Sequence, residues 1–292
     1  MTILVTGRTG QLARALAAAG GEQIRCAGRP DFDFDQPETI ASVFEVIRPS
    51  LVINAAAYTA VDAAESDPQA AYRANCDGPA QLADLCAAYA LPFIHVSTDY
   101  VFDGRTGPYV ETDPTNPQCV YGASKLAGER AAQAACPHAV VLRTSWVYAP
   151  EGKNFVLTML NAARKTDRLR VVADQQGCPT AAADLADAVL AIAAQLQRHR
   201  SESGGIYHAA GSGSTSWYGF ALAIFEEAAR YGWPVPEVMP IATADWPTPA
   251  RRPADSRLDC SKLAETFAVR LPPWRMSLAR TIEQVCVRHG IG

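Results

Sequence analysis

The chain has 292 residues, of which 49% are hydrophobic and 19% are charged, and its formal net charge is −4. This balance is typical of a globular protein with enough residues to bury a substantial core, in one large domain or two smaller ones. Nucleic-acid binding favours a basic surface, so a mildly acidic chain predicts no nucleic-acid partner.

The eight cysteines are scattered along the chain without any C-x-x-C pair. In a chain of this size, that spacing predicts small buried side chains in a reducing compartment and argues against a disulfide framework. The chain begins MTILVTG, which already resembles a strand, and its longest apolar stretches are alanine-rich and interrupted. We therefore expect a cytoplasmic protein with neither a signal peptide nor a membrane span.

The first half of the chain alternates short apolar runs with helical patterns. Strands are expected at 3–5, 24–27, 51–54, 93–97 and 139–144, and helices at 11–19, 37–47, 67–90 and from about 121. Alternation of this kind predicts βαβ units and a parallel sheet. Runs such as LVIN are continuously hydrophobic, as expected when helices cover both faces. The predicted fold class is therefore α/β with a doubly wound sheet.

The turn after the first expected strand has glycine at positions 7 and 10 and a small residue, Ala13, three positions later. Gly7 permits a tight turn, Gly10 lets a pyrophosphate approach the backbone, and Ala13 allows close packing of the helix on the sheet. The helix N-terminus then offers free N–H groups to the phosphates. A purely structural turn has similar glycines, but this position at the start of a βαβ series favours dinucleotide binding and a Rossmann sheet.

The second half of the chain has a looser pattern. Helices are expected at 154–164, 180–195, 217–231 and 278–289, short strands at 169–172 and 205–208, and prolines become dense after position 233. This pattern predicts a smaller, irregular, α-rich domain. We assign residues 1–146 and 173–210 to the dinucleotide-binding domain, and residues 147–172 and 211–292 to a substrate domain.

The end of the second expected strand bears on the choice between NADP and NAD. Arg29 follows that strand and Arg8 lies in the glycine turn, and an arginine there accommodates a 2′-phosphate. Ordinary solvated arginines are about as plausible an interpretation. Asp33 and Phe34 in the following loop could flank the adenine. Small residues in the stretch 54–58 would let a cofactor lie over the sheet.

A tyrosine and a lysine four residues apart, Tyr121 and Lys125, share one face of a predicted helix. Beside the hydroxyl of Thr98, they form a proton-donating site for a carbonyl group. We expect the phenol to be the acid and the ammonium to lower the pKa of that phenol. The alternatives are a helix-start tyrosine with a solvated lysine, and Ser97 in place of Thr98.

Several segments, taken in order, resemble those of the extended short-chain dehydrogenase/reductases, and within them the dTDP-4-dehydrorhamnose reductases. These segments are GRTGQLA, NAAAYTAVDAAES, STDYVFDG, VYGASKLAGE, RTSWVY, DQQGCPT and RRPADSRLD. They run from residue 7 to about residue 259, which is nearly the whole chain. Single segments recur across sugar-nucleotide epimerases and dehydratases, whereas the combination is specific to the rhamnose-pathway reductases.

The resemblance implies reduction of dTDP-4-dehydro-β-L-rhamnose to dTDP-L-rhamnose, the last step of dTDP-rhamnose biosynthesis, with NADPH or NADH as the hydride donor. Tyr121 would protonate the oxygen at sugar C4, Lys125 would hold the nicotinamide ribose, and Thr98 would hydrogen-bond the carbonyl oxygen. Asp99 and Trp146 would help hold the sugar nucleotide. With the residues singled out above, the full cofactor-binding set is Gly7, Gly10, Gln11, Leu12, Arg29, Asp33, Phe34, Ala56, Ala57, Tyr58, Thr59, Tyr121 and Lys125.

The diphosphate of a sugar nucleotide needs a cation, for which Arg251, Arg252 and Arg257 are candidates. Arg252 is the preferred one of the three, and a loop arginine in a salt bridge is about as plausible an interpretation of it. Some members of the family place a divalent metal at a subunit interface through an acidic residue on the first helix. The matching stretch here, QLARA, has no carboxylate. We therefore predict no metal site, although the resemblance still allows a homodimer.

Two other functions stay open at this point. A regulatory subunit would bind NADP without turning over a sugar, although the intact Thr98, Tyr121 and Lys125 argue against that role. A sugar-nucleotide epimerase or 4,6-dehydratase would use the same scaffold, but a dehydratase usually needs an acid and base pair where this chain has Asp99 and Tyr100.

Overall fold

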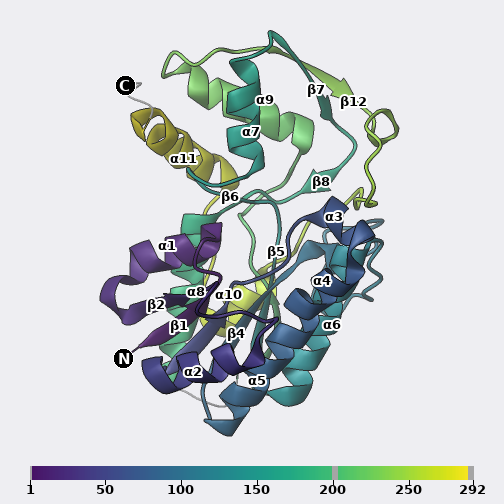
Figure 1. Ribbon diagram of the computed structural model, residues 1–292. Coiled ribbons are helices and arrows are strands. Elements are labelled where there is room, and N and C mark those ends of the chain that lie inside the picture. Colours follow the sequence, from purple (N-terminus) through teal and green to yellow (C-terminus); the bar gives the residue numbers. More distant parts are fainter. Residues whose placement is uncertain (1, 199–202, 289–292) are drawn as a thin grey trace.

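The computed structural model describes residues 2–198 and 203–288. Figure 1 shows two lobes, a larger one built on a central sheet and a smaller one that contains the helices α7, α9 and α11. Three short 3₁₀ turns, Gly21–Gln23, Asp99–Val101 and Thr243–Asp245, connect longer elements. In the described part of the chain, no helix has the length and apolar character needed to cross a membrane.

The larger lobe contains a six-stranded sheet in which every strand pair is parallel. Its strands lie in the order β10-β5-β4-β3-β1-β2, and the predicted doubly wound sheet is confirmed. The chain moves from β1 outward to β2 and then returns to β3 on the other side of β1, so the crevice for a ligand lies beyond the carboxyl ends of β1 and β3. The strands are β1 (Ile3–Thr6), β2 (Ile24–Ala27), β3 (Leu51–Asn54), β4 (Phe93–Thr98), β5 (Val140–Thr144) and β10 (Gly205–His208).

Helices cover both faces of this sheet, as Figure 1 shows. One core lies under α1 (Gln11–Gly20), α8 (Ala182–Arg198) and α10 (Ser261–Phe267). The opposite core lies under α2 (Pro37–Ile47), α5 (Gly78–Ala88) and α6 (Val120–Ala135). Alternate residues of β1 and β3 enter opposite cores, which explains continuous hydrophobic runs such as LVIN.

The predicted helix at 67–90 is three elements instead of one. A short α4 (Pro68–Tyr72) leads into a π-helical turn, η2 (Arg73–Asp77), and α5 follows. The turn contains the buried side chain of Asn75, whose hydrogen bonds to other segments hold the backbone in this form. Such turns are common at functional sites. A further helix before it, α3 (Val61–Ser66), was not predicted.

The smaller lobe is built around α7 (Phe155–Ala163), α9 (Trp217–Ala229) and α11 (Trp274–Arg288). The predicted final helix therefore begins four residues earlier than expected, and its last residue, 289, lies outside the described part. Strand β7 (Arg168–Val172) pairs in parallel with β12 (Glu237–Ile241). We did not predict β12 because it contains Pro240, but a two-stranded ribbon has free edges where proline is tolerated.

Two pairs of very short strands join the lobes. Strand β6 (Val147–Tyr148) pairs with β9 (Thr180–Ala181), and β8 (Gln176–Gly177) pairs with β11 (Thr215–Ser216). Helix α10 lies in the range predicted for the substrate domain, yet Leu263 and Phe267 belong to a core of the sheet. The chain thus returns to the larger lobe after residue 211. The predicted domain division remains a prediction in its other parts, and residues 1, 199–202 and 289–292 of its ranges lie outside the described residues.

A close backbone contact sets the position of α6 and generates a stability prediction. A Cβ atom on Gly128 would collide with the carbonyl oxygen of Asn75 in the π turn. Because overpacking a tight contact costs about 1–3 kcal/mol, we expect Gly128→Ala to lower the free energy of unfolding by that amount. Urea denaturation measures it. The exposed Arg130→Ala on the same helix is the control, and equal stability of the two variants would contradict the prediction.

Candidate active site

The glycine turn after β1 forms a backbone cradle at the crevice. Gly7 has a φ of +90°, and a Cβ there would lie 3.0 Å from the carbonyl oxygen of Ala55. Gly10 precedes α1, and its N–H donates to the Gly7 carbonyl over 2.7 Å. Only glycine combines this positive φ with so close an approach of two segments. The turn therefore has the shape that a dinucleotide pyrophosphate requires at a helix N-terminus.

A cavity of about 440 Å³ opens beside this turn. Seven residues of the predicted cofactor set line it: Gly7, Arg29, Asp33, Phe34, Ala56, Ala57 and Tyr58. Eight more lining residues were not in that set: Arg8, Thr9, Gly28, Phe32, Asp35, Ala70, Arg73 and Ala74. The cavity extends from the glycine turn to the loop after β2, which is the path of the adenosine half of a dinucleotide in this fold.

Six predicted cofactor residues lie outside the lining of this cavity: Gly10, Gln11, Leu12, Thr59, Tyr121 and Lys125. Leu12 is buried in the sheet core, and Thr59 is exposed. Gln11 turns toward the smaller lobe, where it accepts a hydrogen bond from Asn154 over 2.8 Å. Gly10 and Leu12 can therefore offer a nucleotide only their backbone.

The predicted catalytic residues come together at the carboxyl end of β4. Thr98 ends that strand, and Tyr121 and Lys125 lie on the first turns of α6. The hydroxyl of Thr98 donates to Asp99 Oδ1 over 3.0 Å and lies near enough to the phenol of Tyr121 to lower its pKa. The ammonium of Lys125 is 1% exposed and donates to the Val96 carbonyl over 2.7 Å. The three residues that the sequence indicated thus lie together as one cluster.

The structure decides between Thr98 and Ser97. Successive residues of a strand point to opposite faces, so only one of them can face the phenol. Ser97 donates to the buried Glu129 on α6 over 2.5 Å, whereas Thr98 faces Tyr121. Ser97 is therefore occupied within the core, and Thr98 supplies the hydroxyl that faces the phenol.

The expected lowering of the pKa of Tyr121 is wrong. Burial raises the pKa of this phenol, and the hydrogen bond from Thr98 opposes that rise only in part. Lys125 is not among the groups that lower the pKa, because its ammonium donates to Val96 and does not contact the phenol. A phenol with a raised pKa carries its proton at neutral pH, but it is a weaker acid than an unshifted phenol.

Two other groups in the cluster have shifted pKa values. Burial raises the pKa of Asp99 to about 6, and the hydroxyls of Ser256, Thr98 and Ser145 oppose the rise. Burial lowers the pKa of Lys125 to about 8, and the nearby carboxylate of Glu129 opposes the fall. Oxygen Oδ2 of Asp99 is buried without a hydrogen-bond partner, so this carboxylate has capacity to bind a polar ligand atom.

Asn75 in the π turn is a site residue that sequence reasoning missed. Its side chain accepts from the Tyr58 N–H over 2.8 Å and donates to Ser124 Oγ over 3.0 Å. It thereby links the loop that lines the cofactor cavity to the residue next to Lys125. The only signal in the sequence was an asparagine inside an otherwise helical pattern, a position that this residue type disfavours.

A second cavity, of about 310 Å³, lies in the smaller lobe and contains the predicted Arg252. Phe155, Trp217 and Trp246 supply its aromatic lining, and Arg170 a second cation. The other lining residues are Thr158, Met159, Val171, Val172, Gln175 and Thr248. Aromatic faces next to guanidinium groups match a nucleotide base and a diphosphate.

The structure distinguishes among the three candidate arginines. Arg252 lines the second cavity and makes a two-pronged pair with Asp62, at 2.8 and 3.1 Å. Arg257 is bound in the same way to Asp255 and lines a different cavity. Arg251 is exposed and lines neither cavity. Arg252 therefore remains the candidate for the diphosphate.

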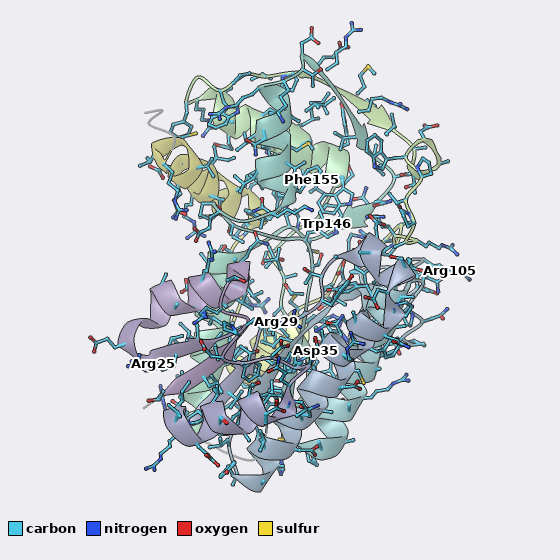
Figure 2. The ribbon with its side chains drawn as sticks, in the orientation of Figure 1. Arg25, Arg29, Asp35, Arg105, Trp146 and Phe155 are labelled. Atoms are coloured by element: carbon cyan, nitrogen blue, oxygen red, sulfur yellow. The ribbon has the colours of Figure 1, made fainter. Side chains whose placement is uncertain are left out.

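Trp146 lies where the two lobes meet, close to Phe155 (Figure 2). Its ring stacks on Trp217 with the centroids 3.5 Å apart. Its φ of +48° is unusual for a bulky residue and turns the chain between β5 and β6. Trp217, the stacking partner, lines the second cavity, whereas Trp146 itself does not.

A dinucleotide cradle and a Thr–Tyr–Lys cluster at the carboxyl edge of one Rossmann sheet define a nucleotide-dependent oxidoreductase of the short-chain dehydrogenase class. A family model described as "RmlD substrate binding domain" matches residues 1–287, so the chain belongs to that family.

Relatives and solved structures agree with this assignment. A dTDP-4-dehydrorhamnose reductase of Sinorhizobium fredii is 47% identical over 97% of both chains. The crystal structure of a dTDP-4-dehydrorhamnose reductase from Clostridium acetobutylicum has a TM-score of 0.89 and 35% identity, covering 97% of this chain and 99% of that one. The same enzyme from Bacillus anthracis, in complex with NADP, has a TM-score of 0.89 and 32% identity, covering 97% of this chain and 100% of that one.

The shifted pKa of Lys125 leads to a prediction about stability and pH. Burial lowers this pKa from 10.5 to about 8, so between these values the unfolded chain binds more protons than the native one. The contribution of Lys125 to the free energy of unfolding therefore rises with pH across that window. Lys125→Met should lack this contribution. The free energy of unfolding of the wild type should therefore rise relative to that of the variant as pH rises.

Urea denaturation at several pH values between about 8 and 10.5 measures this difference. The exposed Lys153→Met is the control and should follow the wild type. A constant difference between wild type and Lys125→Met across the window would contradict the lowered pKa.

Proposed function

We propose that the protein reduces the C4 ketone of dTDP-4-dehydro-β-L-rhamnose to dTDP-L-rhamnose, with hydride from NADPH or NADH. The observation that carries the proposal is the cluster of Thr98, Tyr121 and Lys125 beside the glycine turn on one sheet edge. Relatives that bear the name of this reductase over nearly their full length support the substrate. The NADP complex of the Bacillus anthracis enzyme supports the cofactor.

Tyr121 supplies the proton in this proposal. The nicotinamide, when bound, supplies the hydride at sugar C4, and the phenol protonates the oxygen on that carbon. The phenol carries its proton at neutral pH and gives it up as negative charge develops on the sugar oxygen. Proton transfer leaves a phenolate, which takes a proton from solvent before the next turnover.

Thr98 and Lys125 stabilise the charges that form around this proton transfer. The Thr98 hydroxyl faces the phenol and would turn from Asp99 to donate to the sugar oxygen. Lys125 carries its ammonium on the same helix face, one turn from Tyr121, where it would bind the hydroxyls of the nicotinamide ribose. Substrate and cofactor are thereby oriented by groups that the fold already holds in place.

The sugar nucleotide would extend from this cluster toward the smaller lobe. Asp99 would accept hydrogen bonds from sugar hydroxyls through its unpartnered Oδ2. Trp146 would pack against the sugar. Arg252 would release its partner Asp62 and bind the diphosphate in its place. The aromatic lining contributed by Trp217 would then receive the base.

The alternative functions have less support. A regulatory subunit that turns over no sugar does not need Lys125, Thr98 and Tyr121 together in one cluster. A 4,6-dehydratase has an acid and base pair where this chain has Asp99 and Tyr100. We propose the cytoplasm as the location, which the free thiols of all eight cysteines fit, and a homodimer as the assembly.

The test of this function is NADPH oxidation in the presence of dTDP-4-dehydro-6-deoxyglucose and the 3,5-epimerase that converts it to the true substrate. Loss of NADPH absorbance that depends on both additions supports the reductase. No oxidation, together with NADPH binding in a titration, would refute it and favour the regulatory subunit.

Removal of the phenolic hydroxyl tests the proton donor. Tyr121→Phe should lower turnover by at least ~10²-fold, the usual contribution of a positioned general acid. Nucleotide affinity should remain close to that of the wild type, because the ring and the glycine turn stay in place. Tyr89→Phe, at an exposed tyrosine directly after α5, is the matched control. Near-wild-type turnover by Tyr121→Phe would remove this residue from the proton-donor role.

A further inference from the structure

Three arginines from separate segments meet in the lining of the cofactor cavity. Arg8 lies in the glycine turn, Arg29 follows β2, and Arg73 begins the π turn. Arg8 also donates to the Arg29 carbonyl over 3.2 Å, which holds the first two segments together. Arg73 comes from a region in which the sequence indicated no cofactor residue.

Asp35 bridges two of these arginines. Its Oδ2 lies 2.7 Å from Arg29 Nη2, and its Oδ1 lies 2.8 Å from Arg73 Nε. Figure 2 shows Arg29 and Asp35 next to each other in the larger lobe. Each carboxylate oxygen thus contacts a different guanidinium group. Two guanidinium groups that converge on one anion form a site that fits a phosphate at least as well as a carboxylate.

Asp35 is the displaceable carboxylate of this cluster. Asp33 also pairs with Arg29, at 2.8 Å, but its side chain is only 14% exposed. The loop holds Asp33 through a hydrogen bond from the Asp35 N–H to Oδ1 and another from its own N–H to Thr39. The Asp35 side chain is 42% exposed. Ion pairs at such exposure are weak, so a dianion from solution can replace this carboxylate.

We propose that Arg29 and Arg73 form the binding site for the 2′-phosphate of NADPH, and that Asp35 competes with the phosphate for it. The inference rests on the nucleotide use proposed above. NADPH displaces the Asp35 carboxylate and gains contacts with both guanidinium groups. NADH has a ribose hydroxyl at that position and leaves the carboxylate where it is. The chain therefore prefers NADPH, and the Arg73–Asp35 pair sets the size of that preference.

Arg73 is thus a specificity residue that contacts the cofactor far from the reacting atoms. Arg29, the residue that the sequence indicated, supplies one half of the site. The π turn supplies the other half, and it places Arg73 beside the loop after β2 although 38 residues separate Arg73 from Asp35.

Fragments of the cofactor test the proposal without any sugar turnover. Titration calorimetry on the full chain compares 2′,5′-ADP with 5′-AMP, which differ only in the 2′-phosphate. Arg73→Ala should weaken 2′,5′-ADP about tenfold, the loss of one charge-assisted contact, and leave 5′-AMP within about twofold. NADPH and NADH should show the same difference.

Asp35→Asn gives the opposite and more diagnostic result. Removal of the competing charge should strengthen 2′,5′-ADP binding several-fold and leave 5′-AMP unchanged. Arg105→Ala, an exposed arginine that pairs with Asp103 outside the cavity, is the matched control for both variants. Equal losses for the two fragments in Arg73→Ala would overturn the proposal, because they would show that Arg73 only holds the loop. Weaker 2′,5′-ADP binding by Asp35→Asn would also overturn it.

The outcomes separate this proposal from the proposed function. If the fragments discriminate as expected but no sugar is reduced, the phosphate site stands and the reductase assignment falls. If sugar is reduced while Arg73→Ala treats both fragments alike, the reductase stands and the phosphate site falls.

Discussion

A buried ion pair behind the active site holds the catalytic elements in register. Arg143 on β5 donates to both carboxylate oxygens of Glu129 on α6, at 2.9 and 2.7 Å, and both side chains are at most 2% exposed. Ser97 on β4 donates to the same carboxylate. A buried charge that loses its partner costs several kcal/mol, about 3–5 in typical cases, so α6 cannot slide or rotate relative to the two strands. This constraint puts Lys125, one turn before Glu129, under the Val96 carbonyl.

Much of the site could be predicted from the sequence because its determinants are local. The glycine turn spans a few residues between a strand and a helix, and Tyr121 and Lys125 share a face through helix periodicity alone. Thr98 was predicted from its place at the end of a strand. In each case the chemistry depends on short spacing, and the parallel sheet then brings the strand ends to one edge.

The parts that could not be predicted depend on contacts between distant segments. Asn75 and Arg73 lie in a π turn whose Asn75 side chain bonds the distant Tyr58 and Ser124. Strand β12 contains a proline that local propensity excludes from strands. The sign of the pKa shift of Tyr121 was wrong because it depends on burial, whereas the sequence showed only a neighbouring ammonium. A short sequence pattern does not show which side chains folding removes from water, so it cannot give the direction of a pKa shift that depends on burial.

The return of the chain to the sheet at α10 has a consequence for the order in which the protein can fold during synthesis. The core between the sheet and α2, α5 and α6 is made of residues up to Ala139. The core on the other face extends to Leu271, and the core of the smaller lobe extends to Cys286. A nascent chain emerging from the ribosome can therefore close one face of the sheet early. It must keep the other face and the whole smaller lobe open until its final segment has been made.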